Sequence, residues 1–139
     1  MSSTGLRPFD ATLQLTNTWL NELADELKWT DHARSYHALR AVLHALRDRL
    51  TVGEAAALGA QLPMLVRGFF YEGWRPNDGP RRGHKPEEFL ADIGMSFHDA
   101  PEAELRQITR AVLRLLLRHV SAVEINGIKH AVPAELRSQ

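Results

Sequence analysis

Residues 40–67 read RAVLHALRDRLTVGEAAALGAQLPMLVR, and residues 110–137 read RAVLRLLLRHVSAVEINGIKHAVPAELR. The two segments align without a gap at an offset of 70 residues. Chance would give roughly two or three identities in segments this rich in Ala, Leu and Arg. We therefore predict that the chain consists of two similar halves. The identical positions are Arg40/Arg110, Ala41/Ala111, Val42/Val112, Leu43/Leu113, Leu46/Leu116, Glu54/Glu124, Pro63/Pro133 and Arg67/Arg137.

The spacing of apolar residues is that of α-helices almost throughout the chain. Two long helices are predicted at residues 31–49 and 101–119, each with a stripe of Leu and Val on one side. Each is followed by the signature of a capping box, TVGE at residues 51–54 and SAVE at residues 121–124. No segment alternates between apolar and polar residues as a strand does. The predicted fold is all-α, a bundle of seven to eight helices with the two long helices at its centre.

The chain is expected to form a single domain over residues 1–139, because each half alone is too short to bury a stable core. We predict a first repeat at residues 9–74, a loop at 75–85 and a second repeat at 86–137. The loop is inferred from its sequence, RPNDGPRRGHK, which is rich in Pro, Gly and charge. Trp19 is expected on the flank of the apolar face of the first helix.

Composition limits the class of protein. Seventeen basic residues balance seventeen acidic ones, which argues against a general binder of polyanions. Cysteine is absent, which excludes disulfides and thiolate metal sites. The first residues lack the basic and apolar regions of a secretory signal, and Arg114 and Arg118 interrupt the most apolar segment. We expect a cytoplasmic protein with no membrane association.

The motifs RAVL, LRDRL, AQLP and EGW lie within residues 40–74, and EFL follows at residues 88–90. From about residue 20 to residue 137 the sequence resembles the bacterial domain-of-unknown-function family 2267, an uncharacterised conserved protein family. The resemblance implies an all-helical fold of two similar halves, without an established activity. In the second half LRDRL becomes LLRHV and AQLP becomes HAVP, so these motifs belong to the first half alone.

Motifs for catalysis, metal binding and phosphate binding are not found in the sequence. His37, His44 and Asp48 follow one another at helical spacing and form the best candidate for a metal site. Their counterparts in the second half are a glutamine and two arginines, which argues against metal binding. We predict no metal, no cofactor, no catalytic residue and no enzymatic activity. A site assembled between the halves by residues distant in sequence is left open.

Four arginines lie one turn apart along the second long helix and are called the arginine ladder: Arg106, Arg110, Arg114 and Arg118. Like charges at this spacing destabilise an isolated helix by roughly 0.2–0.5 kcal/mol per pair, so the ladder requires anionic partners. We favour acids of neighbouring helices. The candidates are Glu87, Glu88, Asp92 and Glu124.

The alternative partner of the ladder is nucleic acid or another polyanion. The loop carries further basic side chains that would extend the ladder into one basic strip: Arg81, Arg82 and Lys85. The first half has only one arginine, Arg40, at the positions that match the ladder. The ladder is therefore not a requirement of the repeated fold, and an internal face of ion pairs is favoured over a polyanion site.

Four aromatic residues occur in the segment GFFYEGW at residues 68–74. Helical spacing turns Phe69 and Phe70 toward the core and leaves Tyr71 and Trp74 near the rim of the core. Tyr and Trp are common anchors of protein interfaces, because each has a large apolar body and one polar tip. The favoured interpretation is that they cover the core between the halves, and an interface is the alternative.

Leu115 and Leu117 widen the apolar face of the second long helix, where the first half has Ala45 and Arg47. That helix is then either buried on more sides or in contact with another subunit. A homodimer is left open, and the sequence does not determine the oligomeric state.

The absence of catalytic motifs predicts a non-enzymatic interaction or regulatory module, with a protein as the favoured partner. Binding of nucleic acid or another polyanion through the arginine ladder and the basic loop is the alternative. The candidate interaction surface consists of Tyr71, Trp74, Arg81, Arg82, Lys85, Arg106, Arg110, Arg114 and Arg118.

Overall fold

The computed structural model describes residues 4–81 and 85–137 of the chain. These residues form eight α-helices and two short 3₁₀ helices, η1 and η2, and none of them is in a strand. The all-α prediction is therefore confirmed. The helices are α1 (Arg7–Leu27), α2 (His32–Arg47), α3 (Val52–Ala60), α4 (Met64–Tyr71), η1 (Pro76–Asp78), α5 (Pro86–Gly94), α6 (Glu102–His119), α7 (Ala122–Ile128), η2 (Lys129–Ala131) and α8 (Ala134–Arg137).

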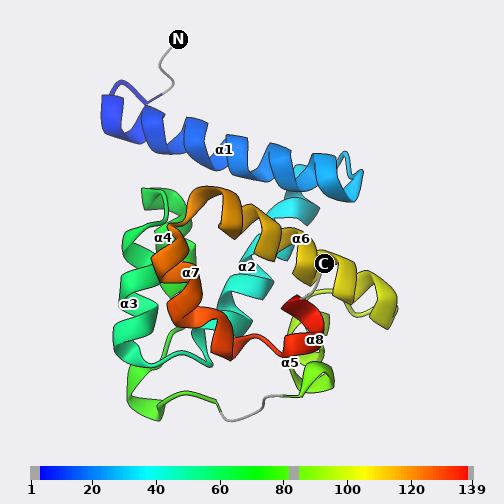
Figure 1. Ribbon diagram of the computed structural model, residues 1–139. Helices are drawn as coiled ribbons and strands as arrows, with labels where there is room; N and C mark the ends of the chain where they lie inside the picture. Colours follow the sequence, from blue (N-terminus) through cyan, green and yellow to red (C-terminus); the bar gives the residue numbers. More distant parts are fainter. Residues whose placement is uncertain (1–3, 82–84, 138–139) are drawn as a thin grey trace.

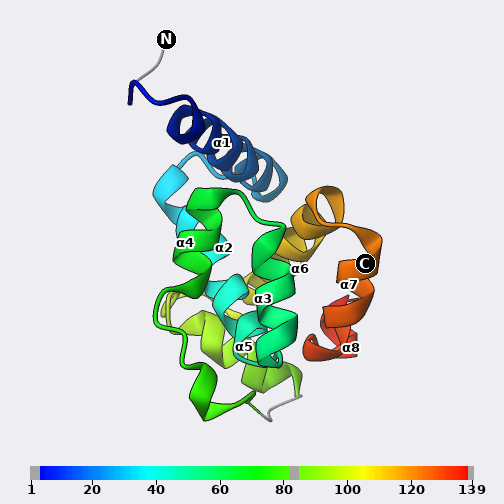
Figure 2. The same ribbon diagram turned by 90° about the vertical axis from the view of Figure 1, so that its left-hand side faces the viewer.

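Helices α2 and α6 contact one another. Between them they also contact most of the remaining helices. Helix α1 lies across both of them at the top of Figure 1. Figure 2 shows α3 in the middle, between α4 on the left and α7 and α8 on the right. The two helices predicted at the centre are thus correctly placed, although α2 ends at Arg47, two residues before the predicted boundary.

Local side-chain bonds explain where several helices begin. The Asp31 carboxylate accepts the Ala33 N–H at the start of α2. At the start of α3, Thr51 and Glu54 form the complete capping box, each side chain accepting the backbone N–H of the other. Both interactions satisfy donors that the first turn of a helix leaves without a partner.

The second predicted capping box is only half formed, which corrects the sequence prediction. Ser121 accepts the Glu124 N–H as expected. The Ser121 N–H, however, donates to the Gln61 side-chain oxygen at 2.8 Å, so the reciprocal bond from Glu124 is replaced. The Gln61 amide also donates to the Ser121 hydroxyl. A residue of the first half thus caps a helix of the second half, which no local motif could indicate.

The core is continuous through both halves and includes the inward faces of α2 and α6. Trp19, expected on the flank of the apolar face of the first helix, is 2% exposed and stacks on His119 with 4.7 Å between ring centroids, so it belongs to the core. Phe70 is fully buried and Phe69 is partly buried, in accord with the inward orientation predicted for both. Leu115 is buried while Leu117 is 60% exposed, so only one of these leucines extends the core.

Helices α2, α3 and α4 begin at residues 32, 52 and 64, and α6, α7 and α8 begin at residues 102, 122 and 134. The pattern of buried, partly buried and exposed residues at 31–42 also recurs at 101–112. Both observations agree with the offset of 70 seen in the sequence. Helix α1 spans 21 residues and α5 only 9, so the first helices of the two halves differ. That the halves form a three-dimensional repeat stays a prediction.

Within the part of the chain that the structure describes, no helix has both the length and the apolar character needed to cross a membrane.

Candidate functional site

The C-terminal end of α2 carries a buried arginine that holds the turn after α4. Arg47 is 4% exposed. Its Nη1 donates to the carbonyl oxygens of Phe70 at 2.9 Å and Glu72 at 2.8 Å. Its other donors bind the Asp48 carboxylate. Because the last carbonyls of a helix have no partner within the helix, this guanidinium supplies the hydrogen bonds that the end of α4 lacks.

A second buried arginine links the same end of α2 to α5. Arg49 donates to the Ala45 carbonyl oxygen at 2.9 Å and to the Asp92 carboxylate at 2.8 Å. Its guanidinium also lies 5.0 Å from the centroid of the Phe89 ring. Burial of a guanidinium requires such hydrogen bonds, because a desolvated charge without partners is strongly unfavourable.

The loop after α4 is bound to the end of α2, close to Arg47 and Arg49. Asp92 accepts a second hydrogen bond at 2.8 Å, from Arg81. The backbone N–H of Arg81 donates to the Asp48 carbonyl oxygen at 2.6 Å. Gly73 has a φ of +75°, which side chains disfavour, and it reverses the chain between α4 and Trp74. The loop therefore crosses the end of α2 with a defined backbone path.

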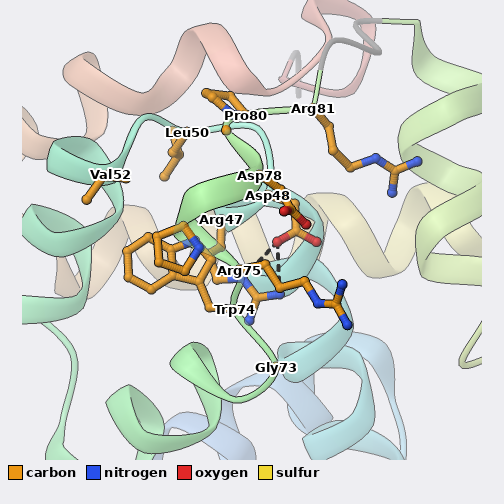
Figure 3. A pocket seen from close by; sticks show the side chains of 12 residues that line it. Arg47, Asp48, Leu50, Val52, Gly73, Trp74, Arg75, Asp78, Pro80 and Arg81 are labelled. Atoms are coloured by element: carbon orange, nitrogen blue, oxygen red, sulfur yellow. Dashed lines mark hydrogen bonds and ion pairs between the residues drawn. The ribbon is translucent and has the colours of Figure 1, made fainter.

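A cavity of about 160 Å³ lies between the end of α2, the turn at Gly73 and the loop (Figure 3). Trp74 forms part of its wall and stacks on Tyr71 with 5.3 Å between ring centroids. The charged side chains that line it are Arg47, Asp48, Arg75, Asp78 and Arg81. The side chain of Arg75 makes no hydrogen bond or ion pair with another described residue. The cavity thus combines an aromatic wall with a free guanidinium.

The predicted surface residues around the loop lie partly at this cavity. Trp74 and Arg81 line it, whereas Tyr71 lies behind Trp74 and packs against Gly59 of α3. Lys85 is exposed at the start of α5, where its N–H donates to Glu88. Arg82 lies outside the described residues.

Three of the four ladder arginines pair with acids, but not with the acids expected. Arg114 pairs with Glu26 of α1, and Arg118 pairs with Glu22 at 3.1 Å and with Glu26 at 3.8 Å. Arg106 pairs with Glu102 one turn earlier on α6. The partners proposed from the sequence were Glu87, Glu88, Asp92 and Glu124. That proposal is wrong because α1, and not α5 or α7, lies along this side of α6 (Figure 1).

Arg110 differs from the other ladder residues in its environment. Its Nη2 donates to the Glu135 carbonyl oxygen of α8 at 3.2 Å. Its Nε is buried without a hydrogen bond among the described residues, as is the Nε of the matching Arg40. No ladder residue lines the cavity next to Trp74. The ladder is therefore separate from the part of the loop that lines this cavity, and a single basic strip formed by the ladder and the loop stays a prediction.

The candidate metal ligands have other partners. The His44 Nε2–H donates to the Phe69 carbonyl oxygen at 2.6 Å, and Asp48 binds Arg47. Burial lowers the pKa of His44 below its usual 6.5, even though the hydrogen bond to Phe69 favours the protonated ring. In the described part of the chain no three His, Asp or Glu side chains are grouped so that they could hold a metal ion.

Two further carboxylates are affected by their neighbours. Burial raises the pKa of Glu54, but hydrogen bonds from Thr51 and His130 outweigh this effect and leave the pKa lowered. In the same way, burial raises the pKa of Glu22, and hydrogen bonds from His119 and Arg118 lower it overall. Both glutamates join segments that are distant in sequence, and neither lines the cavity.

The sequence analysis missed the roles of Arg47 and Arg49. A usable signal was present in LRDRL, where two arginines stand between leucines that continue the buried stripe of α2. Arginines at such positions must find carbonyl or carboxylate partners. The sequence could not show that these partners would be the turn after α4 and Asp92.

Comparison with known proteins places the chain in a family without assigning an activity. A search of curated proteins finds no match to the sequence. The model of the uncharacterised conserved protein family DUF2267 matches residues 16–138, and the chain belongs to that family.

Proposed function

We propose that the protein is a non-enzymatic interaction module that binds a protein partner at the cavity next to Trp74. The observation that carries the proposal is the presentation of Trp74 and Arg75 on a loop that Arg47 and Arg81 fix to the end of α2. Trp and Arg are the side chains that most often dominate binding energy at protein interfaces. A loop that is already ordered loses less entropy on binding.

The chemistry of the cavity supports binding over catalysis. Among the described residues that line it there is no histidine, serine, threonine or cysteine, the usual nucleophiles and bases. Asp48 is engaged by Arg47, and Arg75 offers a charge for recognition. A volume of about 160 Å³ accommodates a single side chain of a partner. Arg75 favours an acidic group of the partner at the edge of the cavity, and the Trp74 ring favours an apolar or aromatic group of the partner.

The experiment compares proteins captured by immobilised wild type with those captured by Arg75→Glu and Trp74→Ala. Arg75 is exposed and without a described partner, so its replacement tests recognition without disturbing the fold. Met95→Ala serves as the matched control, because Met95 is an exposed apolar residue on another part of the surface. We expect a protein captured by wild type and by Met95→Ala to be lost with both cavity variants. Equal capture by all four proteins would contradict the proposal.

Binding of nucleic acid or another polyanion is the second candidate. It is supported by Arg114 and Arg118, whose side chains remain 46% and 45% exposed although they are paired with glutamates of α1. A polyanion would have to compete with Glu22 and Glu26 for these arginines. This candidate is the weaker of the two, because Arg106, Arg114 and Arg118 are already paired with glutamates.

A further inference from the structure

A second cleft, of about 270 Å³, opens between α6, α7 and the segment leading to α8. The floor of the cleft is formed by residues of the hydrophobic core. These are Leu46, Leu116, Ile128 and Val132, all of which are buried. It shares no lining residue with the cavity next to Trp74. The cleft is therefore a separate feature of the molecule, and an inference about it goes beyond the proposed function.

The rim of the cleft combines an exposed leucine with two cations. Leu117 is 60% exposed, although it borders an apolar surface. Lys129 and Arg137 lie at the same rim, and the side chain of neither forms a hydrogen bond or ion pair with another described residue. A ligand that covers Leu117 would remove apolar area from water, and an anion would pair with the two cations.

The matching place in the first half shows what such a surface accommodates. At the offset of 70, Gly59 corresponds to Lys129 and Arg67 corresponds to Arg137. Tyr71 lies so close to Gly59 that a Cβ there would be 2.3 Å from the tyrosine oxygen. Arg67 is bound to the carbonyl oxygens of Gly59 and Leu62. In the first half, a ring of the chain itself thus covers the surface and the arginine is engaged.

In the second half the same place differs in two respects. No described side chain fills the cleft, and its arginine and the added lysine are free of described partners. Leu117 stands where the first half has Arg47, which makes the rim more apolar than its counterpart. The surface therefore has room for an apolar body and a charge suited to one anionic group.

We propose that this cleft binds a small amphipathic carboxylate. The apolar body of the ligand lies on Leu116, Ile128 and Val132 and covers Leu117, and its carboxylate pairs with Lys129 and Arg137 at the rim. The volume lies below the roughly 300–1,000 Å³ of sites for drug-sized ligands, which restricts the body to one medium-length acyl chain or one substituted aromatic ring.

The test titrates the protein with octanoate, octan-1-ol and octylammonium at concentrations below micelle formation. Calorimetry gives the dissociation constants, and amide NMR spectra give the location of binding. We expect saturable binding of octanoate with shifts at Leu117, Ile125 and Lys129. The alcohol should bind at least about tenfold more weakly because it cannot pair with the cations, and the ammonium should not bind.

Two variants and a matched control locate the site. Leu117→Glu places a negative charge at the rim, and Lys129→Glu combined with Arg137→Glu reverses its charge; each should weaken octanoate binding at least about tenfold. Val123→Glu adds the same charge at a residue that is 83% exposed on α7 and does not line the cleft, so it should bind octanoate as wild type does.

The proposal is overturned if octanoate shows no saturable binding to the wild type. It is also overturned if the three head groups bind equally, or if the rim variants bind as tightly as Val123→Glu. The comparison of head groups uses the wild type alone, so the test does not depend on the folding of any variant.

Discussion

Replacing Arg47 with methionine tests the central claim about the site, that a buried guanidinium holds the turn after α4. Methionine keeps an unbranched apolar stem of similar length but removes every donor. The carbonyl oxygens of Phe70 and Glu72 then lose the Arg47 Nη1, which binds them at 2.9 and 2.8 Å. Asp48 also loses its ion-pair partner.

The expected loss follows from these three contacts. A hydrogen bond to a charged group contributes about 1.5–3 kcal/mol, so the two carbonyl bonds contribute about 3–6 kcal/mol. The pair with Asp48 adds at most about 1 kcal/mol, since the Asp48 side chain is 32% exposed. Part of this loss of stability is offset, because the variant buries an apolar methionine and no longer has to desolvate a guanidinium. We expect a net loss of about 3 kcal/mol.

Urea unfolding followed by circular dichroism measures this loss. With a slope of about 1.5 kcal/mol per molar urea, the midpoint should fall by about 2 M. Arg75→Met is the matched control on the same loop, and its stability should stay within about 0.5 kcal/mol of wild type because Arg75 is exposed. A loss below about 1 kcal/mol for Arg47→Met, or an equal loss for both variants, would show that Arg47 does not stabilise the turn after α4.

Three further predictions test the caps, the ladder and the partly buried His44. Thr51→Ala and Ser121→Ala should each cost about 1 kcal/mol in the same unfolding assay, because each leaves a backbone donor at a helix start without its acceptor; unchanged midpoints would contradict the assigned caps. Arg110→Gln combined with Arg114→Gln should lower stability by about 1 kcal/mol through loss of partly exposed contacts, and the wild type should pass through a heparin column at physiological salt. Salt-sensitive retention that the folded double variant abolishes would instead favour polyanion binding. Burial lowers the pKa of His44 from 6.5, so the unfolded chain binds a proton first and stability falls as the pH drops below about 6.5. His44→Gln should remove this part of the pH dependence, and parallel stability profiles of wild type and variant between about pH 7.5 and pH 5.5 would speak against it.

The helical class and the position of most elements could be predicted from the sequence. Apolar spacing located the two long helices, and their observed bounds differ from the predicted ones by two residues at most. Thr51 marked a helix start correctly, because a capping residue and its backbone donor lie within three positions of each other. Such features are local, so they can be recognised without knowledge of the fold.

Which charged side chains form pairs depends on how the helices pack in the tertiary structure. Glu26 pairs with Arg114 although 88 positions separate them, and Gln61 caps α7 from the other half of the chain. The sequence predicted that the ladder would be paired, because repulsion along α6 had to be offset, but it named the wrong acids.

Most of the candidate site could be recognised only in the tertiary structure. Trp74 was recognised in the sequence as a potential anchor, whereas Arg47 was noted only as the counterpart of Leu117. The partners of Arg47 are carbonyl groups more than 20 positions away, and backbone carbonyls carry no sequence signature. Periodicity reports which face of a helix is buried, but only the packing of helices fixes which donors and acceptors that burial brings together.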